Sequence, residues 1–135
     1  MPYRMEINRH KHRVIVTGSD PVDVRDVLTL LDRQIAARAW SFGSLHNARD
    51  VTWLPTDDDI RTIVAYVDRN AHTLGPRGPV AFVARSSRLF GMARMYSQLA
   101  EGSALNARVF QDIAAAARWL DDYESRPPTG PTKVA

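Results

Sequence analysis

The chain begins with a strict alternation of apolar and polar residues. Tyr3, Met5 and Ile7 alternate with polar neighbours, and this pattern predicts a half-exposed strand at the edge of a sheet. The basic segment 9–13 predicts the turn of a hairpin. Residues 14–17 begin with three consecutive β-branched apolar residues, as expected for a buried second strand that lies inside the first.

Helical spacing of apolar residues follows two clear start signals. Asp20 is a suitable N-cap, and the spacing behind it predicts a helix over residues 21–37. Thr56 and Asp59 have the spacing of a capping box and predict a second helix, which Gly75 ends.

The remaining elements alternate between strand and helix. His46 interrupts a short predicted third strand over residues 44–48, where an apolar residue is expected. Further along the chain, the patterns predict a buried strand at 79–84, a helix from Ser86 or Ser87 to about 102, a strand at 107–110 and a helix at 112–123.

This order predicts an α/β fold in a single domain over residues 1–123. An N-terminal antiparallel hairpin leads into four strand-helix units, so the later strands should be parallel and joined by right-handed crossovers. Residues 124–135 are rich in proline and are expected to form a disordered tail.

Three segments resemble the SpoIIAA-like family: WLPTDDDI at the second helix, GPRGPVAFVA at the buried strand and LFGMARMYSQLAE at the third helix. This family is related in fold to STAS domains and to CRAL-TRIO lipid-transfer domains. The resemblance implies a five-stranded mixed sheet with the helices mostly on one face. It also implies a small stand-alone bacterial domain that binds a partner without catalysing a reaction.

In the antagonist branch of that superfamily, a serine before the second helix is phosphorylated and switches partner binding. The matching residues 48–56 contain no serine, and their hydroxyl groups belong to Thr52 and Thr56. Thr56 is expected to cap the helix, and a phosphate there would meet three aspartates at 57–59. A phosphoswitch antagonist of an anti-sigma factor is therefore disfavoured. Asn47 also stands where the family leads us to expect an aspartate.

Composition narrows the possible chemistry. The chain has no cysteine, which excludes disulfides, a thiol nucleophile and thiolate metal sites. Its net charge of +3 is a weak signal for nucleic-acid binding, and none is expected. No apolar run is long enough to span a bilayer and the start has no apolar signal core, so we expect a cytoplasmic protein without stable membrane insertion.

Few residues point to catalysis, a metal or a cofactor, and we expect none of the three. His10 and His12 lie among basic residues that repel a cation, and Asp57 to Asp59 suit a helix N-terminus. His46 and His72 are interpreted as hydrogen-bonded structural histidines. The serines and glycines match no hydrolase or phosphate-loop motif.

Two regions are candidate binding surfaces. The loops after the third and fourth strands carry polar and aromatic residues where open parallel sheets place ligands: Arg49, Asp50, Thr52, Trp53, Arg85, Ser86, Ser87 and Arg88. The third predicted helix has a wide apolar face that includes Met92, Met95 and Tyr96. Capping, exposed charge and core packing are the alternative interpretations of these residues.

A stretch without acidic residues between Asp68 and Glu101 adds a candidate anion-facing surface of five arginines: Arg69, Arg77, Arg85, Arg88 and Arg94. The alternative is a set of solvated arginines on helices and loops.

The favoured function is a regulatory binding module that contacts a protein partner or a second copy as a homodimer. The alternative is a carrier of a small apolar or lipid-like anionic ligand, with Arg85 and Arg88 at the anionic head and Met92, Met95 and Tyr96 along the tail. The carrier needs a cavity, which a sequence pattern does not reveal.

Overall fold

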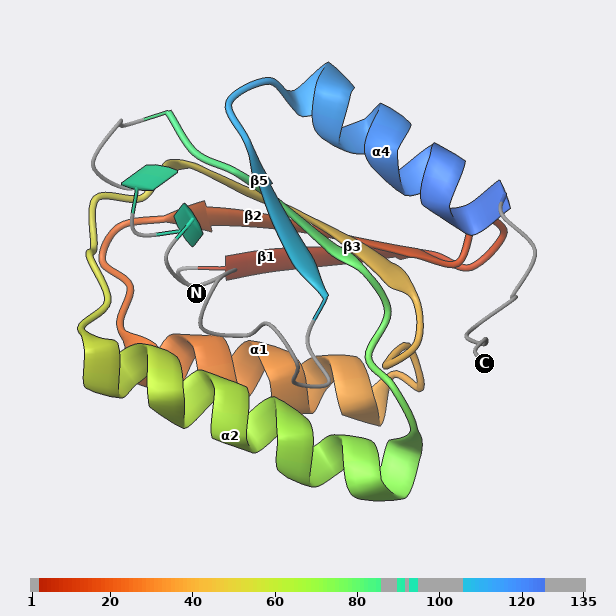
Figure 1. Cartoon of the computed structure of the whole chain (residues 1–135), viewed down its shortest axis with the longest axis horizontal. Helices are drawn as coiled ribbons and strands as arrows, with labels where there is room; N and C mark the ends of the chain where they lie inside the picture. Colours follow the sequence, from red (N-terminus) through yellow and green to blue (C-terminus); the bar gives the residue numbers. More distant parts are fainter. Residues whose placement is uncertain (1–2, 86–89, 92, 95–105, 126–135) are drawn as a thin grey trace.

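The computed structural model describes residues 3–85, 90–91, 93–94 and 106–125 (Figure 1). Along the chain, the elements are β1 (Tyr3–Asn8), β2 (Arg13–Ser19), α1 (Val24–Ala36), β3 (Gly43–Asp50), α2 (Asp57–Leu74), β4 (Val80–Val83), β5 (Ala107–Phe110) and α4 (Ile113–Ser125). Residues 90–91 and 93–94 are helical, and the rest of the predicted third helix lies outside the described residues. Residues 124 and 125 were predicted as the start of the disordered tail, but they belong to α4; the rest of that tail also lies outside the described residues. No helix in this described part is long and apolar enough to cross a membrane.

The five strands form one mixed sheet in the order β1-β2-β3-β4-β5. β1 and β2 pair as an antiparallel hairpin, and β2 to β5 are parallel. The predicted α/β fold, the hairpin and the edge position of β1 are therefore confirmed. The third strand is longer than the prediction of 44–48, because it runs from Gly43 to Asp50.

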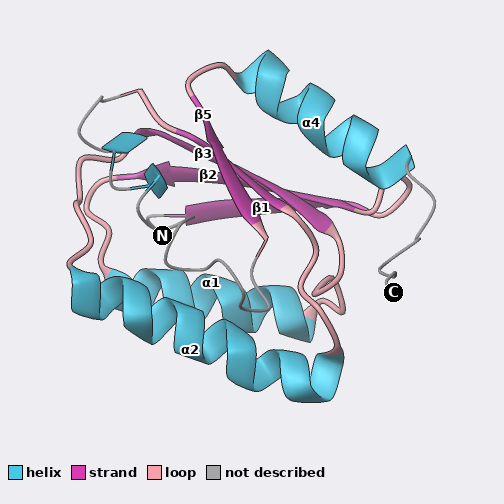
Figure 2. Ribbon diagram, in the orientation of Figure 1, coloured by secondary structure: helices cyan, strands magenta, loops and turns pink. Residues whose placement is uncertain are grey.

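Helices cover both faces of the sheet. α1 and α2 lie side by side on one face, and α4 crosses the other (Figures 1 and 2). The parallel strands have the same order in the sheet as in the sequence. Because each crossover between them is right-handed, the crossover helices α1 and α2 lie on the same face of the sheet. No strand follows α4, which is free to cover the opposite face.

Each face has its own apolar core. On the α1 and α2 side, the buried residues are Val14, Val16, Leu30, Leu31, Ala39, Trp40, Ile63, Val67 and Val80. On the α4 side, the buried residues are Leu45, Ala81, Val83, Ala116 and Leu120. Neighbouring strand residues point to opposite faces, so Leu45 faces α4 while His46 faces α1 and α2.

One predicted helix start is correct and the other is wrong. Thr56 caps α2: its side chain accepts from the Asp59 amide, and the Asp59 side chain accepts from the Thr56 amide. Asp20 does not cap α1. The cap is Asp23, which forms a reciprocal capping box with Asp26, while the Asp20 carboxylate accepts hydrogen bonds from Thr52.

Replacing Thr56 with alanine is expected to lower the free energy of unfolding by about 1 kcal/mol, because the Asp59 amide loses its acceptor. Chemical denaturation in urea measures the loss. Thr56→Ser keeps a hydroxyl acceptor and is the matched control, expected to stay near the wild type. Equal losses in the two variants would contradict a capping role for this hydroxyl.

A buried arginine joins the hairpin to α4. The Arg13 side chain is 7% exposed, and its Nη2 atom donates to Asp121 Oδ1 at 2.7 Å. This hydrogen bond lowers the pKa of Asp121. Arg13 was predicted as the last residue of the hairpin turn, and it is instead the first residue of β2.

Gly78 lies directly against the backbone of the segment before β3. Its amide donates to the Trp40 carbonyl oxygen at 3.2 Å. A Cβ atom at this position would lie 2.2 Å from the Phe42 carbonyl oxygen and 2.5 Å from that of Ser41. The segment before β4 therefore passes against the segment before β3 with no room for a side chain.

Candidate functional site

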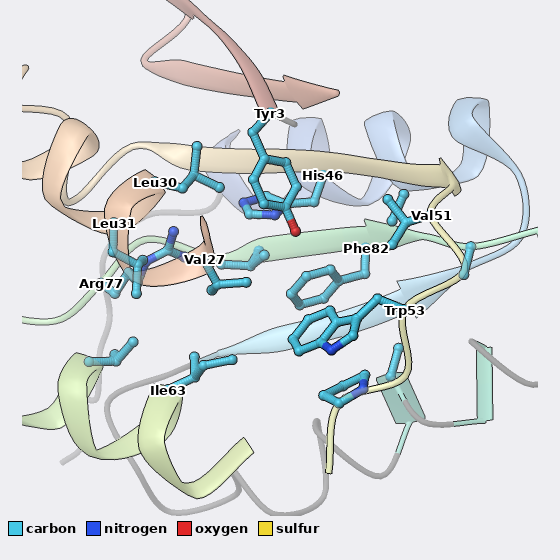
Figure 3. Close-up of a pocket in the computed structure, with 16 residues that line it drawn as sticks. Tyr3, Val27, Leu30, Leu31, His46, Val51, Trp53, Ile63, Arg77 and Phe82 are labelled. Atoms are coloured by element: carbon cyan, nitrogen blue, oxygen red, sulfur yellow. The ribbon is translucent and has the colours of Figure 1, made fainter. Parts of the chain in front are cut away.

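A cavity of about 100 Å³ lies between the sheet and the helices α1 and α2. Aliphatic side chains of the two helices form one wall, among them Val27, Leu30 and Ile63 (Figure 3). The opposite wall comes from the sheet and from the loop after β3. The cavity lies toward the carboxyl ends of β3 and β4, where open parallel sheets usually bind ligands.

Aromatic side chains form much of the sheet-side wall. His46 on β3 and Phe82 on β4 are paired across the two strands, with ring centroids 5.1 Å apart and an interplanar angle of 65°. Trp53, from the loop after β3, completes this side (Figure 3). The aromatic rings and the aliphatic helix wall give the cavity a largely apolar lining.

Tyr3 reaches the cavity from the edge strand because its partner in the hairpin is a glycine. Tyr3 is paired with Gly18, and a Cβ atom on Gly18 would lie 2.7 Å from Cε1 of the Tyr3 ring. The hydroxyl group of Tyr3 points into the cavity (Figure 3). Burial raises the pKa of Tyr3 to about 12, and the negative charge of Asp26 adds to this effect.

His46 brings a polar atom to this apolar site. Its Nε2 atom is buried and has no hydrogen-bond partner among the described residues. Burial lowers the pKa of His46 to about 3, and the positive charge of Arg77 contributes, so the ring is neutral near pH 7. The prediction that His46 is a hydrogen-bonded histidine is therefore wrong for its Nε2 atom, because His46 lies against Phe82 in an apolar environment.

Arg77 is a buried cation at the same wall. The residue is 5% exposed, its Nη2 atom donates to Gln34 Oε1 at 2.7 Å, and its guanidinium lies 5.6 Å from the centroid of the Trp40 ring. Gln34 is itself fixed, because its Nε2 atom donates to the Ala39 carbonyl oxygen and to Ser44 Oγ. The prediction that Arg77 belongs to an anion-facing surface of five arginines is therefore wrong.

Arg49 and Asp50, predicted in the loop after the third strand, are instead the last residues of β3, and Asp50 lies beside the loop after β4. Arg85 Nη2 lies 3.9 Å from Asp50 Oδ1, and both side chains are exposed. The Arg49 Nε atom donates to Asn47 Oδ1 at 3.2 Å.

The two remaining residues predicted in the loop after β3 have different surroundings. The Thr52 amide and hydroxyl both donate to the Asp20 carboxylate, and the hydroxyl bond lowers the pKa of Asp20. Trp53 lines the cavity, unlike Arg49, Asp50, Thr52 and Arg85.

Six predicted binding residues lie outside the described residues: Ser86, Ser87, Arg88, Met92, Met95 and Tyr96. Within the described ranges, no group of three or more histidine, aspartate or glutamate side chains could hold a metal ion. Three cavity residues with polar side chains were not predicted from the sequence as site residues: Tyr3, His46 and Arg77. The sequence did single out His46, because it is a polar residue in a strand that is expected to be apolar.

The arrangement can enclose a small apolar group and offer it one or two polar contacts. The chain matches no protein-family model and no curated protein sequence. The fold and the cavity therefore carry the functional argument.

Proposed function

We propose that the chain is a non-catalytic binding module whose cavity holds a small apolar molecule. The observation that carries this proposal is the apolar cavity between the sheet and the helices α1 and α2. Its position toward the carboxyl ends of parallel strands is the usual ligand position in open α/β sheets. Proteins seldom keep unfilled apolar space, because a void forfeits packing contacts.

The size of the cavity favours a small ligand over a long acyl chain. An apolar cavity on the order of 150 Å³ can bind benzene. The volume of about 100 Å³ is on this scale. The alternative function expected from the sequence is a carrier of an apolar or lipid-like ligand. We therefore propose a ligand that is smaller than a lipid.

The fold supports a relationship to the SpoIIAA-like family. A hairpin followed by parallel strands in sequential order, with two crossover helices on one face, is compatible with the fold that the resemblance implies. We propose this relationship, together with a cytoplasmic location and the absence of catalysis. A phosphoswitch stays disfavoured, because the Thr52 hydroxyl donates to Asp20 and the Thr56 hydroxyl accepts from the Asp59 amide.

A protein-binding surface is the second proposal. The end of β3 and the loop after β4 form one exposed surface through the 3.9 Å approach of Arg85 to Asp50. Native mass spectrometry of the wild-type chain tests it. A homodimer that Arg85→Glu converts to a monomer would support this surface, and a monomeric wild type would count against self-association.

Filling the cavity should abolish small-molecule binding. Ala48 lines the cavity, and Ala48→Leu places three more carbon atoms in it. We expect toluene affinity, measured by isothermal titration calorimetry, to fall at least about tenfold, with stability unchanged or raised because the added carbons fill a void. Ala65 is exposed on α2, and Ala65→Leu is the control that should bind like the wild type. Unchanged toluene binding in Ala48→Leu, or no binding by the wild type, would overturn the proposal.

A further inference from the structure

The shape and chemistry of the cavity walls restrict the ligand further, provided that the proposed binding function holds. Rings from three strands and one loop line one side, namely Tyr3, Trp53 and the paired His46 and Phe82. Aromatic rings attract one another in edge-to-face and offset arrangements, beyond the gain from buried area alone. A flat ring in this space would lie between aromatic side chains and the aliphatic side chains of α1 and α2 (Figure 3).

The polar groups of the cavity favour a ligand with one hydrogen-bonding group. The Nε2 atom of His46 has no hydrogen-bond partner within the described chain, although it is buried. A buried polar atom without a partner is costly, and a ligand that reaches the imidazole would remove this cost. The Tyr3 hydroxyl points into the same space and can both donate and accept (Figure 3).

The charges around the cavity favour an uncharged ligand. His46 is neutral near pH 7, because burial and the positive charge of Arg77 lower its pKa to about 3. Arg77 would repel a cationic ligand. A carboxylate would lose its hydration in a largely apolar lining.

From these three observations, we infer that the cavity selects a single-ring aromatic molecule with one uncharged hydrogen-bonding group, of which phenol is the simplest. The ring fits between the aromatic and aliphatic walls, and the hydroxyl reaches the His46 imidazole or the Tyr3 hydroxyl. No bond is made or broken, so the cavity acts as a receptor for the molecule.

Isothermal titration calorimetry of the whole chain with four probes tests this inference: phenol, toluene, benzoate and n-octanol. We expect phenol to bind about three- to tenfold more tightly than toluene, which corresponds to one hydrogen bond. Benzoate and octanol should bind more weakly than phenol. If benzoate binds more tightly than phenol, the inference that the ligand is uncharged is wrong. If octanol binds more tightly than phenol, the inference that the ligand is aromatic is wrong.

Two variants locate the selectivity. His46→Phe keeps a ring but removes the nitrogens, and it should bind phenol and toluene with affinities that agree within about twofold. His72 is exposed on α2, and His72→Phe is the control that should keep the preference for phenol. A preference for phenol that survives in His46→Phe and is lost in Tyr3→Phe would assign the contact to the Tyr3 hydroxyl.

A spectroscopic measurement keeps the inference testable if His46→Phe does not fold. In the wild type with ¹⁵N-labelled histidine, phenol should shift the ring-nitrogen resonances of His46 more than toluene does. Toluene binding without any preference for phenol would overturn this inference and leave the proposed function standing. Failure of all four probes to bind would overturn both.

Discussion

Replacing Gly78 with alanine is expected to lower the free energy of unfolding by at least about 3 kcal/mol. The new Cβ atom would lie 2.2 Å from the Phe42 carbonyl oxygen and 2.5 Å from the Ser41 carbonyl oxygen. Both atoms belong to the backbone, so a side-chain rotation cannot relieve the contact. The two segments would have to separate, which would also break the hydrogen bond from the Gly78 amide to Trp40.

Chemical denaturation followed by circular dichroism measures this effect. Gly91→Ala is the matched control, because a Cβ atom there meets nothing within 4 Å. Since alanine is the better helix former, this control should be as stable as the wild type or more stable. A Gly78→Ala variant that denatures at the wild-type urea concentration would show that the segments before β3 and β4 do not pack as closely as described.

Acidification should destabilise the protein through His46 well before most carboxylates titrate. The folded-state pKa of about 3 lies below the ordinary histidine value of 6.5, so the unfolded chain binds a proton that the folded protein excludes. Stability is therefore complete above pH 6.5 and falls as the pH is lowered toward 3. The expected slope approaches about 1.4 kcal/mol per pH unit below pH 6.5, which gives a loss of about 2 kcal/mol between pH 6.5 and 4.5.

The difference between the wild type and His46→Phe isolates this contribution. The carboxyl groups of Asp20 and Asp121 have lowered pKa values in the folded protein, so they lose stabilisation mainly below pH 4 and do so in both proteins. Urea denaturation at pH 7, 6, 5 and 4.5 should give a steep decline in the wild type and a shallower one in His46→Phe. His72→Phe should follow the wild type. Parallel curves for the wild type and His46→Phe would mean that His46 accepts a proton in the folded state.

Local patterns predicted most of the fold, because its elements follow local rules. The alternation in β1 and the capping box of α2 each depend on residues within a few positions of one another. The alternation of strands and helices, combined with the handedness of crossovers, then predicted a largely parallel sheet. The start of α1 was misplaced because two aspartates offer similar caps, and the contact of Asp20 with Thr52 joins residues far apart in the chain.

The cavity was much harder to predict than the fold. Tyr3, His46 and Arg77 come from separate elements, and no spacing rule connects them. Arg77 has the sequence context of a surface arginine, and its burial depends on Gln34, 43 positions earlier in the chain. Of the predicted loop residues with described positions, Trp53 alone lines the cavity, because the others are exposed or paired with neighbouring polar groups.

The position of α4 has a consequence for how the chain folds during synthesis. Arg13 leaves the ribosome early, but Asp121, which neutralises its buried charge, follows more than a hundred residues later. Until α4 emerges, Leu45, Ala81 and Val83 on that face of the sheet also lack their cover. A nascent chain that stops before α4 would therefore expose apolar surface on this face and lack the Asp121 carboxylate beside Arg13. Exposed apolar surface makes a partly synthesised chain prone to aggregation, so this face should need protection until α4 has been made.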